Sequence, residues 1–502
     1  MKRSNLNRFS GKRITIFGAN RSGIAIAKLL YDLGASISLT DTRDADVLSA
    51  EISQLDGMQI QFYLGGHEES CIANTELVVV SPGVPLDIPI LVEAKNRSIP
   101  ILGELEVSAS LCDARIVAIT GTKGKSTTTL LTAAILEASN LFSDVVVAGN
   151  IGVPLASNVA TLTRKDVAVV EASSFQLEST FTFQPVVSVM LNFSRDHLDR
   201  HGTMESYLNA KLKICVNQTN SEWIVLNADD ATAKCFAHAT AAKKAFFTDN
   251  LSNKDENSEV LSRKLDNGAG ARLQNNANNI GIYTYKNNQE HWICNTTDIP
   301  LAGAHNIRNV LAAVVVGTIF DVTPADMCKA ILKFNRIHPA FEHAFEKVSV
   351  VNGVDYVNDS KATNVIATCA ALESVEKTAE HGKDPKRVFL IIGGFDKGND
   401  YGPLIELVRT KVKSLVMLGE HTHNIQKTFA GCADMHHTAT MEAAVEFAYT
   451  HAKSGDIVLL SPSNASFDMY TDYKQRGEAF KNAVNSLKSY KSSDQEKSTC
   501  DR

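Results

Sequence analysis

A short turn at residues 121–127 gathers two glycines, two lysines and several hydroxyls in the sequence GTKGKST. It follows an apolar, β-branched run at 115–120 and precedes a helical pattern, so it predicts a strand that turns sharply into a helix. Such a turn directs backbone N–H groups and the positive end of a helix dipole toward one point. The glycines allow a phosphate to approach, Lys125 can reach its outer oxygens, and the Ser126 hydroxyl suits Mg²⁺. Ile119 stands where the common loop has a glycine, which indicates a shorter variant.

Acidic and imidazole side chains follow two further strand-like runs. Glu171 closes the first run, and Asp196 and His197 come soon after the second, which spans 186–194. Because parallel strands end at the same edge of a sheet, we expect these groups beside the phosphate loop, where they could bind a metal ion. The alternatives are a surface acid and a solvated loop. Lys211 follows in an apolar helix and, taken alone, resembles a surface lysine whose stem covers apolar groups.

Short apolar strands alternate with helical patterns along most of the chain, which is typical of parallel sheets covered by helices. The clearest strand patterns are at 13–17, 35–41, 76–85, 166–174, 186–194, 223–230, 354–360, 387–394, 414–420 and 456–463. We therefore predict an α/β protein of three domains: Rossmann-like at 1–109, phosphate-loop at 110–334 and Rossmann-like at 335–502. Residues 248–290 are rich in Asn, Asp, Lys and Ser and predict an insertion, part hairpin and part loop. The polar tail from Lys491 predicts disorder.

The bulk composition is that of a soluble protein. The chain has 502 residues, 44% of them hydrophobic and 21% charged, and a net charge of -6, which argues against a nucleic-acid-binding protein. Nine cysteines without a CxxC pair favour reduced thiols over disulfides or a zinc site. No apolar run is long enough to cross a membrane, and the basic N-terminus lacks the apolar core of a signal peptide. We expect a cytoplasmic protein that binds neither nucleic acid nor membrane.

Polar residues also follow the strands of the first group. GANRSG at 18–23 lacks the middle glycine of a dinucleotide fingerprint, so plain strand–helix packing is an equal alternative to ligand binding. Asp41 ends the next strand, where a carboxylate often binds ribose hydroxyls, and Ser81, Pro82 and Gly83 end the third. A nucleotide or nucleotide-sugar site could form at these strand ends, whereas a redox cofactor is not indicated.

Several longer motifs come in one order along residues 13–485. They are GTKGKST, GNIG (149–152), EASSFQLE (171–178), DHLDRHGTMESYLNAK (196–211), LAGAHNIRN (301–309), NDSKATN (358–364), GGFDKGND (393–400) and LLSPSNASFDMYTDYKQRGEAF (459–480). This series resembles the Mur ligases, and NDSKATN with DHLDRHGTM resembles their glutamate-adding branch. The resemblance implies an ATP-dependent ligase of cell-wall precursor synthesis, which adds glutamate to UDP-N-acetylmuramoyl-L-alanine through an acyl phosphate. We expect a monomer.

The resemblance also implies roles for individual residues. Those around ATP are Gly121, Thr122, Lys123, Gly124, Lys125, Ser126, Thr127, Asn306 and Asn309. Those around two Mg²⁺ ions are Ser126, Glu171, His197 and Lys211. Those around the UDP-bearing substrate are Asp41, Thr42, Arg43, Ser81, Pro82, Gly83 and Asn150. Those around glutamate are Lys361, Thr363, Lys397, Ser466 and Tyr473.

Elementary electrostatics explains why this chemistry needs cations. A carboxylate that attacks a phosphate brings two anions together, and two unit charges 4 Å apart repel by about 4 kcal/mol at an effective dielectric constant of 20. Lys125 and Mg²⁺ would offset this repulsion, and His197 could assist the later proton transfer. Lys211 resembles the family lysine that carries a carbamate, and because CO₂ reacts with the neutral amine, its pKa should be lowered by burial or by neighbouring cations.

Two positions depart from the family pattern, and one of them bears on the alternative functions. Ala344 follows His343 where the family has an arginine, for which Arg336 or a neighbour could substitute, and Lys123 stands where asparagine is commoner. A folylpolyglutamate synthase shares the phosphate-loop domain, but the first-domain strands and NDSKATN argue against it. A nucleotide-binding regulatory protein without ligase activity is the second alternative, and Ala344 is its only support.

Overall fold

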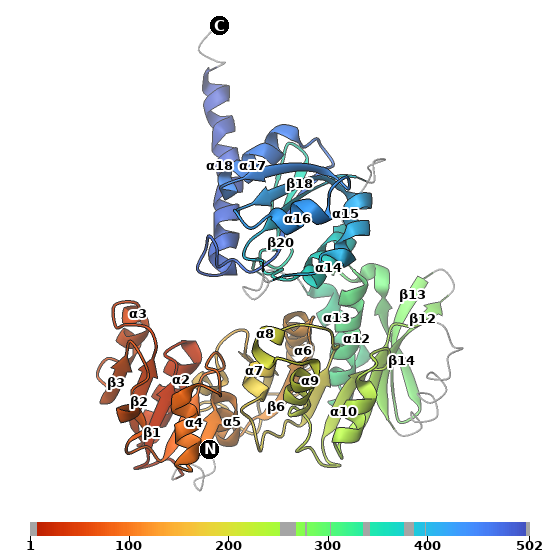
Figure 1. Ribbon diagram of the computed structural model, residues 1–502. Helices are drawn as coiled ribbons and strands as arrows, with labels where there is room; N and C mark the ends of the chain where they lie inside the picture. Colours follow the sequence, from red (N-terminus) through yellow and green to blue (C-terminus); the bar gives the residue numbers. More distant parts are fainter. Residues whose placement is uncertain are drawn as a thin grey trace. The chain divides into compact units, whose positions relative to one another are not determined.

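The computed structural model describes residues 8–251, 268–276, 279–301, 303–334, 342–375, 386–396 and 398–497. The chain divides into two compact units, Met1–Pro300 with Asn306–Phe334 and Leu301–His305 with Asn335–Arg502. The first unit contains two β-sheets and the second contains one (Figure 1). Each sheet is mostly parallel and covered by helices, which confirms the predicted α/β fold with three domains.

The N-terminal sheet has the strand order β3-β2-β1-β4-β5, and all of its pairs are parallel. Its elements are β1 (Arg13–Phe17), α2 (Arg21–Asp32), β2 (Ser36–Asp41), α3 (Ser49–Ile52), β3 (Ile60–Leu64), β4 (Leu77–Val80), α4 (Pro89–Asn96), β5 (Ile101–Gly103) and α5 (Glu104–Leu111). Strands β1 and β4 are apolar and almost wholly buried, as expected for parallel strands covered on both faces. The strand order reverses at β1 and β4, and ligands of such sheets bind at the carboxyl ends of the strands there.

The central sheet has the order β14-β13-β12-β11-β10-β9-β6-β8-β7. Its strands are β6 (Arg115–Thr120), β7 (Val145–Gly149), β8 (Val167–Glu171), β9 (Val187–Met190), β10 (Trp223–Asn227), β11 (Lys243–Thr248), β12 (Ala269–Asn276), β13 (Asn279–Lys286) and β14 (Gln289–Asn295). Its helices are α6 (Lys125–Ala138), α7 (Ser174–Leu177), α8 (Leu198–His201), α9 (Met204–Leu212), α10 (Ala233–Ala239), α12 (Ala304–Ile319) and α13 (Pro324–Lys333). Because β6 lies between β8 and β9, the segments that follow these three strands share one edge of the sheet.

The C-terminal sheet has the order β15-β16-β20-β17-β18-β19. Its elements are β15 (Glu346–Val351), β16 (Val354–Asn358), α14 (Val365–Ser374), β17 (Val388–Gly393), α15 (Ile405–Lys411), β18 (Val412–Leu418), α16 (His423–Thr428), β19 (Asp434–Thr438), α17 (Met441–His451), β20 (Ile457–Ser463) and α18 (Tyr473–Lys497). Among these described strands, β15 alone runs antiparallel to its neighbour. Strands β16 and β20 are adjacent, so the loops that follow them meet at one edge.

The expected strands all form, and two smaller predictions have different outcomes. The described part of the insertion is a hairpin, in which β12 pairs with β13 antiparallel, as predicted. The prediction of a disordered tail from Lys491 is wrong as far as Lys497, because α18 continues to that residue. Once the first turns of a helix are packed, each further residue adds a hydrogen bond without a new nucleation cost, which accounts for the difference. The proposed domain bounds at 109/110 and 334/335 stay predictions.

Candidate functional site

The phosphate loop joins β6 to α6 as the sequence predicts. Gly121 has a φ of 154° and Gly124 a φ of 83°, both in the region that favours glycine. Gly124 is the N-cap of α6, so Lys125 and Ser126 form the first turn of the helix. The ammonium of Lys125 donates hydrogen bonds of 3.0 Å to the carbonyl oxygens of Gly121 and of Thr122, which folds the side chain over the loop.

Asn192 holds this loop in place by hydrogen bonds, and the sequence had not indicated it as a site residue. The side chain of Asn192, just after β9, accepts from the backbone N–H of Lys123 at 2.8 Å and donates to the carbonyl of Lys123 at 3.0 Å. The backbone N–H of Thr122 donates to the carbonyl of Asn192 at 2.9 Å. The ammonium of Lys123 lies 3.7 Å from the carboxylate of Asp196. The segment after β9 therefore fixes the conformation of the loop.

The two asparagines of HNIRN meet the loop from α12. Asn309 accepts from the Thr128 hydroxyl at 3.3 Å and donates to Asn306 at 3.2 Å, and both asparagines are buried. A Cβ at Gly124 would overlap the side-chain oxygen of Asn309. Gly124 is therefore required both for the turn and for the approach of α12.

Lys211 lies in the interior of the protein. Its helix pattern taken alone had indicated a surface lysine instead. Its side chain is 1% exposed, and its ammonium donates to the carbonyl of Gly121 at 2.8 Å and lies 4.8 Å from the centre of the Tyr207 ring. Burial, reinforced by the charge of Lys125, lowers the pKa of Lys211 well below its ordinary value, while Asp196 and Glu171 act in the opposite direction. The direction of this pKa shift is the one that favours carbamate formation.

Glu171 closes β8 at the same edge. It is 1% exposed, and one carboxylate oxygen accepts from the Asn150 side chain at 2.7 Å. The other oxygen, Oε2, is buried and has no hydrogen-bond partner among the described residues. A buried carboxylate oxygen without a donor is costly, and a divalent cation would satisfy it. The residues at this edge therefore fit a Mg²⁺ ion.

His197 stands in a left-handed conformation, with a φ of 52°, at the start of α8. Its ring packs edge-on against Phe175 at 4.9 Å. Burial lowers its pKa, the charges of Lys125 and Lys211 lower it further, and Asp196 opposes them. A neutral imidazole at neutral pH can bind a metal ion or accept a proton. The structure thus brings Lys125, Glu171, His197 and Lys211 into one electrostatic cluster.

Asp41 and Arg43 form a pair at the carboxyl end of β2. Arg43 donates to both carboxylate oxygens of Asp41, at 3.0 and 2.9 Å, and the backbone N–H of Ala19 donates at 2.8 Å. Burial by itself would raise the pKa of Asp41, but these bonds outweigh it and lower the pKa to about 2. Ser81, after β4, is buried and donates to the carbonyl of Gly18 at 2.9 Å, whereas Thr42 and Gly83 are exposed.

The Asp41 pair gives a stability prediction with a defined sign. The pKa in the folded state lies below its ordinary value of 3.8, so the carboxylate stabilises the fold above that pH and loses this effect as the pH falls toward 2. Asp41→Asn is expected to lower the free energy of unfolding by about 2 kcal/mol at neutral pH. Urea unfolding followed by hydrogen exchange in β1 and β2 measures this loss. Asp46→Asn is the control, because Asp46 is exposed. If the loss of unfolding free energy in Asp41→Asn persists unchanged near pH 2, it does not arise from the charge of Asp41.

Arg200 connects the central sheet to the N-terminal sheet within the first unit. Its guanidinium donates to the carbonyl of Val84 at 2.8 Å, next to the Ser81–Gly83 turn, and pairs with Glu178. Arg200 lies in the motif at 196–211, and the sequence alone assigned it no role. Its partners lie far away along the chain, so no local signal could have revealed them.

The C-terminal sheet brings four of the five residues expected around glutamate to the loops after β16 and β20 and to the start of α18. Lys361 is half-buried and its backbone N–H donates to the carbonyl of His343 at 2.9 Å. Thr363 is exposed, Ser466 is buried and Tyr473 is half-buried. Lys397 and Arg336 lie outside the described residues. Ala344 lies in the turn before β15 and supplies no charge.

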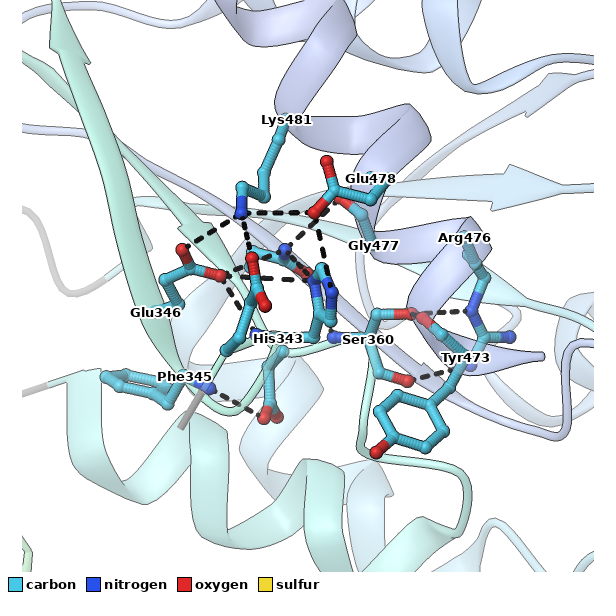
Figure 2. A network of polar contacts seen from close by, with 12 residues as sticks. His343, Phe345, Glu346, Ser360, Tyr473, Arg476, Gly477, Glu478 and Lys481 are labelled. Atoms are coloured by element: carbon cyan, nitrogen blue, oxygen red, sulfur yellow. Dashed lines mark hydrogen bonds and ion pairs between the residues drawn. The ribbon is translucent and has the colours of Figure 1, made fainter. Parts of the chain in front are cut away.

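A second polar cluster surrounds His343 (Figure 2). The side-chain amide of Asn358 contacts Nδ1 of His343 at 2.9 Å, and the carboxylates of Glu346 and Glu478 lie 3.9 and 3.7 Å from the ring. Glu342, His343 and Glu478 could in principle bind a metal. However, the ammonium of Lys481 lies 2.6 Å from Glu342 and 3.1 Å from Glu478. Lys481 forms ion pairs with Glu342, Glu346 and Glu478, so the cluster is a structural ion-pair network.

This fold and this edge of the central sheet define a phosphate-loop nucleotide-binding protein with three α/β sheets. Sequence profiles match the Mur ligase MurD-like N-terminal domain at 12–103, the Mur ligase middle domain at 119–317 and the Mur ligase glutamate ligase domain at 345–464. The chain belongs to the Mur ligase family, as the motifs predicted.

Individual relatives support this assignment. The chain is 38% identical over 481 residues to UDP-N-acetylmuramoylalanine--D-glutamate ligase of Clostridioides difficile, covering 95% of this chain and 99% of that protein. It is 37% identical to the protein of the same name from Geotalea daltonii, covering 95% and 98%. The fold is similar to UDP-N-acetylmuramate-alanine ligase MurC of Thermotoga maritima, with a TM-score of 0.58 at 16% identity over 96% of this chain and 99% of that one. Among the described residues, no helix is long and apolar enough to cross a membrane.

Proposed function

We propose that this protein is an ATP-dependent ligase that joins D-glutamate to UDP-N-acetylmuramoyl-L-alanine in peptidoglycan precursor synthesis, giving ADP and phosphate. The ligase class rests on family membership and on relatives that carry this name over almost their whole length. The observation that carries the proposal is the cluster of Lys125, Glu171 and Lys211 around the phosphate loop. Cytoplasmic location and a monomeric state remain predictions.

The chain's residues supply the electrostatics of the first step. A substrate carboxylate oxygen bonds to the γ-phosphorus of ATP as the bond to the β-phosphate oxygen breaks, which yields an acyl phosphate and ADP. The loop N–H groups and Lys125 would hold the phosphates. Ser126 and Glu171 would hold one Mg²⁺, and His197 would contribute to the second. When bound, Mg²⁺ shields the negative charge of the phosphates. Asn306 and Asn309, fixed against the loop, would contact the nucleotide.

Lys211 has a separate role in this proposal. Its lowered pKa raises the fraction of neutral amine, which can bond to the carbon of CO₂ and lose a proton, giving a carbamate with one negative charge. This change converts a buried cation beside Gly121 into an anion that suits a second Mg²⁺. In the second step, the glutamate amine attacks the carbonyl carbon, phosphate leaves and the amine loses a proton. His197, when it is not bound to Mg²⁺, or a nearby base can accept that proton.

The N-terminal and C-terminal sheets would bind the two other substrates. Asp41, Thr42 and Arg43, with the Ser81–Gly83 turn, would contact the UDP part, and Asn150 would contact the muramoyl part. Lys361, Thr363, Ser466, Tyr473 and Lys397 would contact the two carboxylates of glutamate. Cations and hydroxyls at both ends of the amino acid provide one binding group for each carboxylate.

Glu171 gives a direct test of the metal site. Glu171→Gln keeps an oxygen for the Asn150 bond but removes the charge, so we expect a loss of about 100-fold in kcat and a weaker response to Mg²⁺. A Mg²⁺ titration of phosphate release measures both effects. The exposed Glu205→Gln, from the first turn of α9, should behave as the wild type. An unchanged Mg²⁺ response in the Glu171→Gln variant contradicts the proposed ligand role.

One assay tests the function itself. The protein is incubated with ATP, Mg²⁺, UDP-N-acetylmuramoyl-L-alanine and either D- or L-glutamate, and the products are identified by mass. We expect ADP and a glutamyl product only with all three substrates, and with the D-enantiomer. Product from a folate in place of the UDP substrate favours a folylpolyglutamate synthase. ATP binding without any product favours a regulatory protein.

A further inference from the structure

Arg476, near the start of α18, is a fully buried cation. The residue is 1% exposed, which is unusual for a guanidinium. Among the described residues it makes no ion pair with a carboxylate within 4.0 Å. Burying a charge in this way is unfavourable unless hydrogen bonds replace those of water. The partners of Arg476 therefore indicate why the cation is placed here.

The guanidinium donates hydrogen bonds to two loops, and Figure 2 shows those to Ser360. Nε donates to the hydroxyl of Ser360 at 3.0 Å and Nη2 donates to the carbonyl of Ser360 at 2.9 Å. Nη1 donates to the carbonyl of Asn464 at 3.1 Å. The Ser360 hydroxyl donates in turn to the carbonyl of Tyr473 at 2.7 Å. A planar group with fixed donor directions thus sets the spacing of three backbone segments.

These three segments carry the residues proposed to bind glutamate. Ser360 immediately precedes Lys361, Asn464 lies two residues before Ser466, and Tyr473 begins α18. The side-chain nitrogen Nδ2 of Asn464 is buried and has no hydrogen-bond partner among the described residues. This loop thus retains a donor that a ligand oxygen could satisfy.

We infer that Arg476 is a positioning residue of the acidic amino acid's site, one that sets the distance between the loop of Lys361 and Thr363 and the loop of Ser466. This inference rests on the proposed function. The cation also contributes positive potential to both loops, which the charges of Asp468 and Asp359 partly offset. Burial lowers its pKa to about 10, and Arg476 therefore stays charged at neutral pH.

The test compares three variants: Arg476→Lys, Arg476→Ala and Ser360→Ala. Arg476→Lys keeps the positive charge but loses the planar set of N–H donors of the guanidinium. Each is expected to raise the KM for glutamate, by about 30-fold in Arg476→Ala and by less in the other two. The KM for ATP should change by less than about twofold, because the ATP-binding residues belong to the other unit. The first step can be followed as ATP–ADP exchange in the presence of the UDP substrate and without glutamate. In all three variants this exchange should continue at the wild-type rate. Millimolar guanidinium chloride should lower the raised KM of Arg476→Ala, whereas ammonium should not.

Matched controls separate the possible outcomes. Arg409→Ala removes an exposed arginine that pairs with Glu406 at 2.8 Å, and it should leave every parameter unchanged. If the wild-type protein forms no product, the proposed function fails. If the wild type is active and all three variants keep the wild-type KM for glutamate, the positioning role is overturned. A uniform loss of exchange and melting temperature, without rescue, also overturns it, because a purely structural role predicts that pattern.

Discussion

Replacing Lys211 with methionine is expected to lower kcat by about 1000-fold, because the variant lacks the amine that forms the carbamate. Lys211 is buried at the carbonyl of Gly121, and its pKa is lowered mainly by burial. Removing CO₂ and bicarbonate from the wild-type assay should therefore depress activity, and restoring them should recover it. Incubation with ¹³C-bicarbonate should give a carbamate carbon signal by NMR in the wild type and none in the variant.

The neighbouring Lys213 supplies the control. It is half-buried, and its ammonium donates to the carbonyl of Glu178 at 2.6 Å. Lys213→Met removes a lysine of the same segment and should keep the carbamate signal and CO₂ dependence. Full wild-type activity after thorough removal of CO₂ contradicts the carbamate, even if Lys211→Met is inactive.

Lys125→Met is expected to reduce kcat/KM for ATP by about 1000-fold. In the structure the ammonium donates to the loop carbonyls of Gly121 and Thr122, and a phosphate can replace those weak neutral acceptors. Methionine keeps most of the length of the side chain and removes its charge. Steady-state kinetics and direct binding of a non-hydrolysable ATP analogue measure the loss.

Lys123→Met is the comparison within the same loop. Its ammonium is about one third exposed and lies 3.7 Å from Asp196, so water and that carboxylate already screen its charge. We expect less than about a tenfold effect on kcat/KM. Equal losses in the two variants contradict a special role for Lys125 and favour a general effect of loop charge.

Local patterns were sufficient for most of the fold. The predicted strands at 13–17 and 387–394 correspond closely to β1 and β17, because buried parallel strands are continuous apolar runs bounded by turns. The glycine spacing at 121–127 predicted the turn into α6, since φ angles depend on the residue itself and its neighbours. The family motifs then predicted the ligase class, which the relatives confirm.

The tail shows where local patterns failed. A polar composition favoured disorder from Lys491, yet α18 continues to Lys497. The first turns of that helix are held by Arg476 and by packing on β15 and β16, and a helix that has been nucleated extends at little cost. The composition of residues 491–497 does not show that contacts elsewhere in the fold stabilise the first turns of the same helix.

The amino-acid sequence by itself determined the α/β fold, the phosphate loop and the membership in a ligase family, because these depend on periodicity and on short motifs. Only the tertiary structure decided which side chains are buried and which atoms they contact. Asn192 is hydrogen-bonded to the phosphate loop, 69 residues away in the sequence. Arg476 is hydrogen-bonded to Ser360, 116 residues away. The low pKa of Lys211 arises from burial, which no single helix pattern determines. Chain folding creates these effects because it brings distant groups together and removes water from around them.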